Sequence, residues 1–334
     1  MHTHSHSRGG ILLTSEILRL GEQPRQVQRL QRAGSLQRLR RGVFVDAEKW
    51  VGATPRSKYL LRLRAVAATR IREPVFSHAS AAAIHGLPLL HRQMLAAHIS
   101  SDPVGRSRNG VIRHRSLPGR TAELIDGLWC TSLADTLADL ALTSDLAAFV
   151  VPADHALHRV ARDALLPGEW AVVESTAAGD AARAFSERVR ESILATGRTR
   201  GLHQALRSLA FATHLADSPG ESVSRCTIHL LGFPAPELQH PFHDEDGFIG
   251  WSDFWWPGQQ VAGESDGEGK YLDPAILQGR TTERALVDEK WREDRIRNTG
   301  ARVVRWDWAT ARDPKKLHAR LFAAGLRLES RGRA

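Results

Sequence analysis

Apolar residues near the N-terminus recur at helical spacing and then change to the alternation of short strands. Val27, Leu30 and Ala33 share one face of a helix that opens at Pro24 and ends at Gly34, since positions three and four apart lie on the same side of a helix. A shorter helix over 16–20 precedes it, and two strands over 36–45 follow around a basic turn. Residues 11–56 are therefore predicted to form a winged helix-turn-helix, after a disordered leader over residues 1–10.

The following region, residues 57–218, is rich in Ala, Leu and Arg and is predicted to be mainly helical, with short strands between Met94 and His114. Asp135 and Asp139 are like charges one helical turn apart, and we interpret them as exposed or capping residues. His78 and His85 lie two turns apart on one helix, which is too far for a simple chelate, and we interpret them as residues at a helix cap or packed under the helix. A break at 217–220 ends the region.

Residues 219–330 follow a third pattern, in the order helix, three strands, helix, strand. Gly232 ends the first helix, and a strand begins at Glu237. The next two strands run over 248–255 and up to Asp266, and a helix over about 281–298 precedes a last strand over 302–306. This order predicts an α/β domain with a mixed sheet. The fold class expected for the whole chain is α+β and multidomain, with a winged helix, a helical middle region and this C-terminal domain.

Three carboxylates fall on neighbouring strands of the C-terminal domain. Glu264 and Asp266 point the same way because strand side chains alternate between faces, and a paired strand brings Asp253 beside them. Such a group repels itself unless a hard divalent cation such as Mg²⁺ or Mn²⁺ takes the oxygens as ligands. The pattern predicts metal-dependent phosphodiester hydrolysis. The alternative is that these acids are solvated at strand ends and that Asp266-Gly267 is only a turn.

Charge is concentrated at one end of the chain. The 334 residues include 46 Lys and Arg against 37 Asp and Glu, a net charge of +9. Residues 1–72 alone hold 15 basic and 4 acidic side chains, so they carry +11 and the remainder is close to −2. A basic module on a near-neutral body favours a nucleic acid as partner, most of all DNA. A solvated arginine-rich helix face is the alternative.

Other features of the composition indicate the cellular compartment. Cys130 and Cys226 lie far apart and match no zinc or redox spacing, which favours reduced thiols in a cytoplasmic protein. No apolar run approaches the ~18 residues of a membrane span and no secretory signal opens the chain, so no membrane partner is expected.

Three N-terminal segments, 14–18, 28–34 and 39–44, together resemble the N-terminal domain of AbiEi-type antitoxins. In that family the domain binds promoter DNA and represses its own operon. The resemblance implies that phosphate-neutralising and base-reading side chains lie on the second helix and on the wing. On the helix these are Arg25, Gln28, Arg29 and Arg32, and on the wing Arg38, Arg40 and Arg41.

Segments between about residues 220 and 328 resemble the restriction-endonuclease-like superfamily of PD-(D/E)xK nucleases, in the branch similar to very-short-patch-repair endonucleases. The likeness rests on Glu221-Ser222, 236–239, Asp253-Phe254, Trp256-Pro257, 264–267, Lys270-Tyr271, 289–294 and 304–306. It implies that Asp253 and Glu264 hold the metal, with Asp266 as a third acid. Glu221 would join the metal shell or orient the water, and Gln239 would contact the phosphate or the attacking water. Asp266 stands where the family usually has lysine, so Lys270 or Lys290 has to supply positive charge, with Arg305 as a further candidate.

The sequence differs from the pattern of these nucleases at Trp251-Ser252, Gly263 and Ser265. These differences could loosen the strands that position the acidic side chains. Two other readings therefore stay open. One is a nuclease-like fold that only binds DNA. The other is a non-catalytic transcriptional regulator or antitoxin, with a cognate toxin as partner. The long Ala- and Leu-rich helices leave a homodimer open as well.

Overall fold

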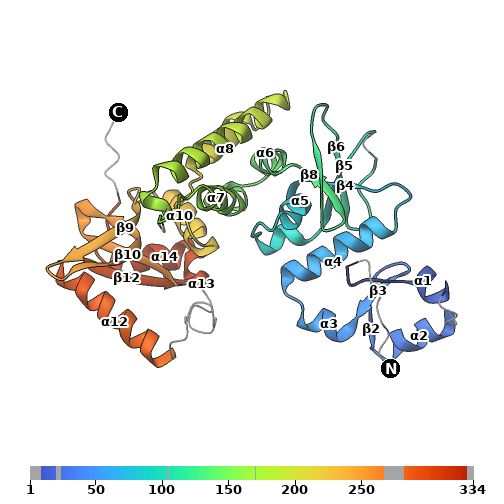
Figure 1. Ribbon diagram of the computed structural model, residues 1–334, viewed down its shortest axis with the longest axis horizontal. Coiled ribbons are helices and arrows are strands. Elements are labelled where there is room, and N and C mark those ends of the chain that lie inside the picture. The colour runs from blue at the N-terminus through green and yellow to red at the C-terminus, as the bar shows by residue number, and fades with distance from the viewer. Residues whose placement is uncertain (1–8, 20–23, 104, 170, 267–281, 329–334) are drawn as a thin grey trace. The chain divides into compact units, whose positions relative to one another are not determined.

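The computed structural model describes residues 9–19, 24–103, 105–169, 171–266 and 282–328, and its contacts divide the chain into two compact units. The first unit comprises residues 1–152 and 187–207, and the second comprises 153–186 and 208–334. Helices α7 (Leu146–Asp163) and α8 (Thr176–Ala195) contribute to both units. Figure 1 shows a mixed α/β protein with three separate sheets.

The first unit opens with the predicted order of two helices and a hairpin. Strand β1 (Leu12–Leu13) leads into α1 (Thr14–Arg19) and α2 (Pro24–Arg32), and β2 (Leu36–Arg40) and β3 (Val43–Asp46) form the hairpin, in the sheet order β1-β3-β2. Helices α3 (Ala47–Gly52) and α4 (Pro55–Ala68) follow. The small sheet is stabilised by α4, because Ala65 packs with Ile11 and Val43 in one buried cluster.

The opposite side of α4 packs against a five-stranded sheet. Its strands are β4 (Val75–Phe76), β5 (Ala97–Ser101), β6 (Val111–Arg115), β7 (Ala122–Ile125) and β8 (Leu128–Thr131), in the order β6-β5-β4-β8-β7. Tyr59 and Leu63 of α4 share a core with Phe76 and Ile99. The middle region is thus less purely helical than predicted. The strands outside Met94–His114 were missed because they have two to four residues, too few to show alternation.

Helices complete the first unit and enclose a buried polar cluster. Helix α5 (His78–Ile84) packs on the sheet and α6 (Leu133–Thr143) packs against α5, while α9 (Leu202–Phe211) is divided between the two units. His78 is buried and stacks on His114, with 3.6 Å between ring centroids. Nδ1 of His98 lies 2.9 Å from Nε2 of His114. His78 was correctly interpreted as a packing residue.

Asp135 and Asp139 have different environments on α6. Asp135 is part of the helix cap, since Ser132 donates to its carboxylate at 2.8 Å. Asp139 is buried, within 3.3 Å of Nδ1 of His78 and paired with Arg120. The expectation of an exposed or capping residue was therefore wrong for Asp139, because Arg120, distant in the sequence, supplies the compensating charge.

The second unit contains the predicted C-terminal order. Helix α10 (Pro219–Leu231) precedes β9 (Glu237–Asp244), β10 (Gly247–Trp256) and β11 (Val261–Asp266), which pair antiparallel in sequence. Helix α12 (Thr282–Asn298) then leads to β12 (Arg302–Asp307), parallel to β11, and α13 (Trp308–Ala311) and α14 (Pro314–Ala323) follow. The sheet is mixed, as predicted, and the structure gives its strand order as β12-β11-β10-β9.

Helices cover both faces of this sheet (Figure 1). Ile296 of α12 packs with Trp255 and Ala262 on one face. On the other face the Trp306 indole donates to Ser224 of α10 at 2.8 Å. Because strand side chains alternate, Asp253 and Glu264 lie on the α12 face with Trp255 and Ala262. None of the helices in the described residues is long and apolar enough to cross a membrane.

Candidate functional site

Two of the predicted acids are neighbours on adjacent strands. The antiparallel register pairs Phe254 of β10 with Gly263 of β11, so the next positions, Asp253 and Glu264, stand opposite each other. At this point a side-chain hydrogen bond takes the place of a backbone one between the two strands. Oδ2 of Asp253 accepts the Ser265 N–H at 2.7 Å. That hydrogen bond holds the Asp253 carboxylate between the two strands, close to Glu264.

The surroundings of the Glu264 carboxyl group disfavour its charged form. Its residue is only 5% exposed. Burial and then the charge of Asp253 raise its pKa to about 7, although Arg292 and Arg305 oppose the shift. Burial and the neighbouring carboxylate thus both disfavour the ionised form of Glu264. This is the electrostatic situation that a bound cation would relieve.

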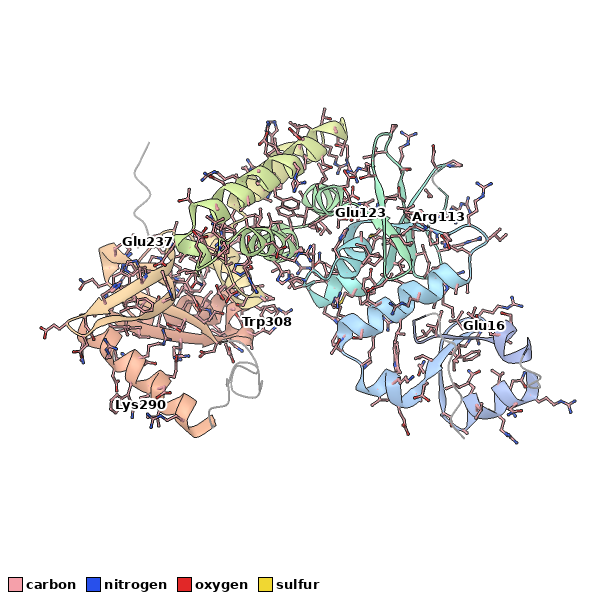
Figure 2. All side chains as sticks on the ribbon, in the orientation of Figure 1. Glu16, Arg113, Glu123, Glu237, Lys290 and Trp308 are labelled. Atoms are coloured by element: carbon pink, nitrogen blue, oxygen red, sulfur yellow. The ribbon has the colours of Figure 1, made fainter. Side chains whose placement is uncertain are left out.

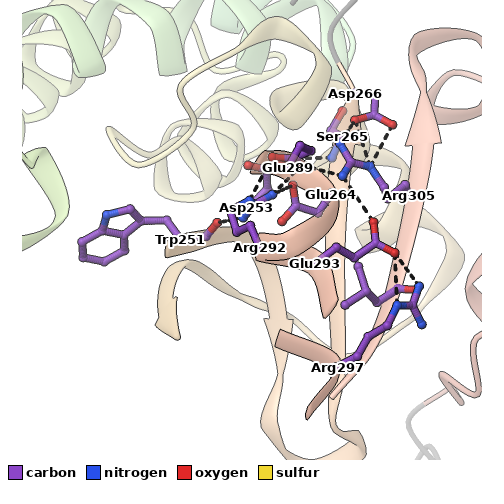
Figure 3. A network of polar contacts seen from close by, with 11 residues as sticks. Trp251, Asp253, Glu264, Ser265, Asp266, Glu289, Arg292, Glu293, Arg297 and Arg305 are labelled. Carbon is purple, nitrogen blue, oxygen red and sulfur yellow. Dashed lines mark hydrogen bonds and ion pairs between the residues drawn. The ribbon is translucent and has the colours of Figure 1, made fainter. Parts of the chain in front are cut away.

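An arginine from α12 lies against these acids (Figure 3). Nη2 of Arg292 donates to Glu264 at 2.9 Å, and Nη1 donates to the carbonyl of Trp251 at 2.9 Å. The same guanidinium binds Glu289, one turn earlier on its own helix, at 2.8 Å. Arg292 thus connects α12 to both β10 and β11. The Trp251 ring points away from the acids (Figure 3).

Asp266 is held by a different arginine. Nη2 of Arg305, on β12, donates to Asp266 at 2.5 Å, and Nη1 donates to Glu289 at 2.6 Å. Glu289 therefore bridges Arg292 and Arg305. Burial opposes its ionisation, but hydrogen bonds from the two guanidinium groups lower its pKa to about 2. Asp266 belongs to this ion-pair network at the edge of the site.

Glu221 and Gln239 are brought together at the start of α10. The Glu221 carboxylate accepts from Ser218 Oγ at 2.7 Å, from the Asp217 N–H at 2.9 Å and from the Gln239 amide at 3.1 Å. Its described contacts are thus those of a helix cap. The adjacent Gly220 lies so close to β11 that an added Cβ would be 2.9 Å from Oγ of Ser265. Gln239 has a φ of +50°, a backbone strain found preferentially at functional sites.

The structure describes one of the two lysines predicted to supply positive charge. Lys290 is exposed on α12 (Figure 2), and Lys270 lies outside the described residues. Arg292 and Arg305 contact Glu264 and Asp266. Arg305 was a candidate from the sequence, whereas Arg292 and Glu289 were missed as site residues. The spacing of Glu289 and Arg292, three residues apart on a helix, was the available signal.

Asp253 and Glu264 fit a hard cation by their chemistry, since both offer anionic oxygens from adjacent strands. Their shared charge and the raised pKa of Glu264 are the observations in favour. In the described part of the chain, no group of three or more His, Cys, Asp and Glu residues is arranged to hold a metal ion. Asp266 as a third ligand of the same ion therefore stays a prediction.

The residues predicted to contact DNA lie on the first unit. Arg25, Gln28, Arg29 and Arg32 are exposed on α2, and Arg38 and Arg41 are exposed on the hairpin. Arg40 is half-buried, and its Nη1 donates to the carbonyl of Asn109 at 3.3 Å. The exposed basic side chains are thus free of the core and available to a polyanion.

Comparisons with known proteins add a partial likeness. No family model matches this chain. Two uncharacterised proteins, from two strains of Mycobacterium tuberculosis, are each 34% identical to it over 93 residues, which is 28% of this chain. The matched segment spans 34% of the length of each of those relatives.

Proposed function

We propose that this protein is a DNA-binding, metal-dependent endonuclease that hydrolyses phosphodiester bonds at Asp253 and Glu264. The observation that carries the proposal is the juxtaposition of these two acids where the β10–β11 ladder ends, with the pKa of Glu264 raised to about 7. Perturbed carboxyl groups of this kind are typical of functional sites. The order of α10, the four strands and α12 also supports a nuclease function, because the resemblance to PD-(D/E)xK nucleases rests on this order of elements.

In this proposal Asp253 and Glu264 hold a Mg²⁺ or Mn²⁺ ion. A bound divalent ion would supply Lewis acidity and lower the pKa of a water ligand. The protein's own groups have separate tasks. The Ser265 N–H orients Asp253. Arg292 and Arg305 supply the positive charge that the phosphate needs as negative charge builds up on it. Glu221 of α10 would join the metal shell or orient the water, and Gln239 of β9 would contact the phosphate or the attacking water.

The test is a cleavage assay with the full chain. Purified protein is incubated with supercoiled and single-stranded DNA in Mg²⁺ or Mn²⁺, and nicking is followed on gels. Asp253→Asn and Glu264→Gln should each lower the rate by at least 100-fold. Asp246→Asn changes one acid in the β9–β10 turn and serves as the matched control with an unchanged rate. An equal residual rate in all three variants would identify a contaminating nuclease and defeat the proposal.

One observation favours a second function, that of a non-catalytic regulator or antitoxin. Arg292 and Arg305 already pair with Glu264 and Asp266, so the acids have internal counter-ions. On this reading the second unit binds a partner, such as a toxin, and the first unit binds promoter DNA. Binding to the protein's own promoter should then be salt-sensitive, be lost in Arg29→Gln/Arg32→Gln and be unchanged in Asp253→Asn.

A further inference from the structure

Three arginines from separate elements gather beside the predicted wing. Arg40 lies on β2, Arg70 follows α4, and Arg113 lies on β6 of the five-stranded sheet (Figure 2). The bond from Arg40 to the Asn109 carbonyl joins the wing to the turn before β6. The Arg113 guanidinium lies over the preceding loop, since a Cβ added to Gly105 would be 2.7 Å from its Nη1. The wing is thus joined through Arg40 and Asn109 to the strand that carries Arg113.

A groove lies at this junction, beside Arg40 and Asn109. It is lined by Thr14 and Ser15 from α1, by Arg40 and Arg41 from the wing, and by Thr69 and Asn109 from the neighbouring segments. No carboxylate is among the described residues that line it. Hydroxyl groups, an amide and guanidinium groups are the donors that proteins use for phosphate oxygens.

The charge of these arginines lacks internal compensation. Among the described residues, no carboxylate lies within 4.0 Å of Arg40, Arg70 or Arg113, although other arginines of the same unit are paired. Burial, followed by repulsion from Arg113 and Arg40, lowers the pKa of Arg70. Like charges held together in this way cost stability, and an external polyanion would offset that cost.

We infer that Arg70 and Arg113, together with Arg40 and the groove, bind the phosphate backbone of duplex DNA as a second contact beyond α2 and the wing. The inference rests on the DNA binding in the proposed function and not on the nuclease site. A duplex fits better than a small anion because the donors are spread over several elements, while each DNA strand presents a charge every 3.4 Å along the axis. Exposed Arg106 and Arg108, on the loop before β6, extend the surface.

The experiment measures the salt dependence of binding by the full chain to a fluorescent duplex of random sequence. Without Mg²⁺, fluorescence anisotropy gives the slope of log affinity against log salt. If Arg70 and Arg113 each neutralise one phosphate, Arg70→Gln/Arg113→Gln should flatten the slope by about 1.8. The affinity should then fall roughly 60-fold at 0.1 M salt, by the same relation.

Two control variants keep the result interpretable. Arg92→Gln/Arg190→Gln removes the same charge from arginines that are paired with Asp145 and Glu187, and its slope should stay that of the wild type. Arg70→Lys/Arg113→Lys keeps the charge and should retain most of the slope. The glutamine variant of Arg70 and Arg113 should melt no lower than the wild type, because it removes repulsion.

The outcomes separate this inference from the proposed function. If the glutamine variant of Arg70 and Arg113 keeps the wild-type slope while Arg29→Gln/Arg32→Gln loses binding, DNA binding stands and the second contact is refuted. If the wild-type chain binds no duplex, both fail. Calorimetry with inorganic phosphate tests a small anion as the ligand. If phosphate binding depends on Arg70 and Arg113 while the salt slope for DNA stays unchanged in their glutamine variant, the cluster binds a small anion and the inference is overturned.

Discussion

Gly263 is the residue whose substitution most directly tests how β11 is packed. A Cβ at this position would be 2.7 Å from Cη2 and 3.0 Å from Cζ3 of Trp306, and 3.1 Å from Cζ3 of Trp256. Both indoles are buried. Each is anchored by its N–H, Trp306 to Ser224 and Trp256 to the Pro234 carbonyl, both at 2.8 Å. Neither ring can withdraw without weakening a hydrogen bond.

These contacts set the expected size of the effect. Overpacking a well-filled core costs typically 1–3 kcal/mol, and strain on a buried hydrogen bond adds about 1 kcal/mol. Alanine also lowers the backbone entropy of the unfolded chain, which stabilises the folded state and offsets roughly 0.5–1 kcal/mol of this loss. Gly263→Ala should therefore lower the free energy of unfolding of the second unit by about 1–3.5 kcal/mol.

The assay is urea unfolding followed by tryptophan fluorescence. Gly258→Ala is the matched control, because nothing lies within 4 Å of its added Cβ and its φ is not positive; its stability should be unchanged or slightly higher. Trp306→Phe removes the atoms that clash, so the double variant should recover part of the loss due to Gly263→Ala. Equal stability of the two alanine variants would refute the packing argument.

Two further predictions concern titration. Asp253→Asn should lower the pKa of Glu264 from about 7 toward, but not down to, the ordinary glutamate range, because burial remains when the neighbouring charge is gone; carbon NMR of labelled glutamate measures this, and an unmoved titration would show that the two carboxyls do not interact. In the first unit, burial lowers the pKa of His98 and of His114 to about 4, against ~6.5 in an unfolded chain. The unfolded state then binds more protons between these values, so stability should be complete above pH 6.5 and fall by roughly 2–3 kcal/mol as pH drops toward 4, after allowance for solvent screening. Urea midpoints at pH 7.5 and 5.0 should show a smaller drop for His114→Gln than for the exposed control His203→Gln, and identical drops would contradict the assignment.

The sequence by itself determined the elements that have strong local signals. Helix caps and glycine stops located α10, where Ser218 accepts from the Glu221 N–H and Gly232 adopts a left-handed φ of 77°. Alternation located β10 and β11 and placed Glu264 and Asp266 on one face. These features depend on residues close together in the chain, which is why a single sequence reveals them.

The tertiary structure alone decided which charges meet. Arg292 reaches Glu264 across 28 positions, Arg305 reaches Asp266 across 39, and Arg120 reaches Asp139 across 19. Each pairing depends on how a helix or strand packs against another, and no local pattern encodes that. The sequence thus identified the acids, whereas the fold determined their arginine partners, placed Asp266 against Arg305 and buried Asp139. Long-range packing governs these outcomes because the energy of a charge depends on its three-dimensional surroundings.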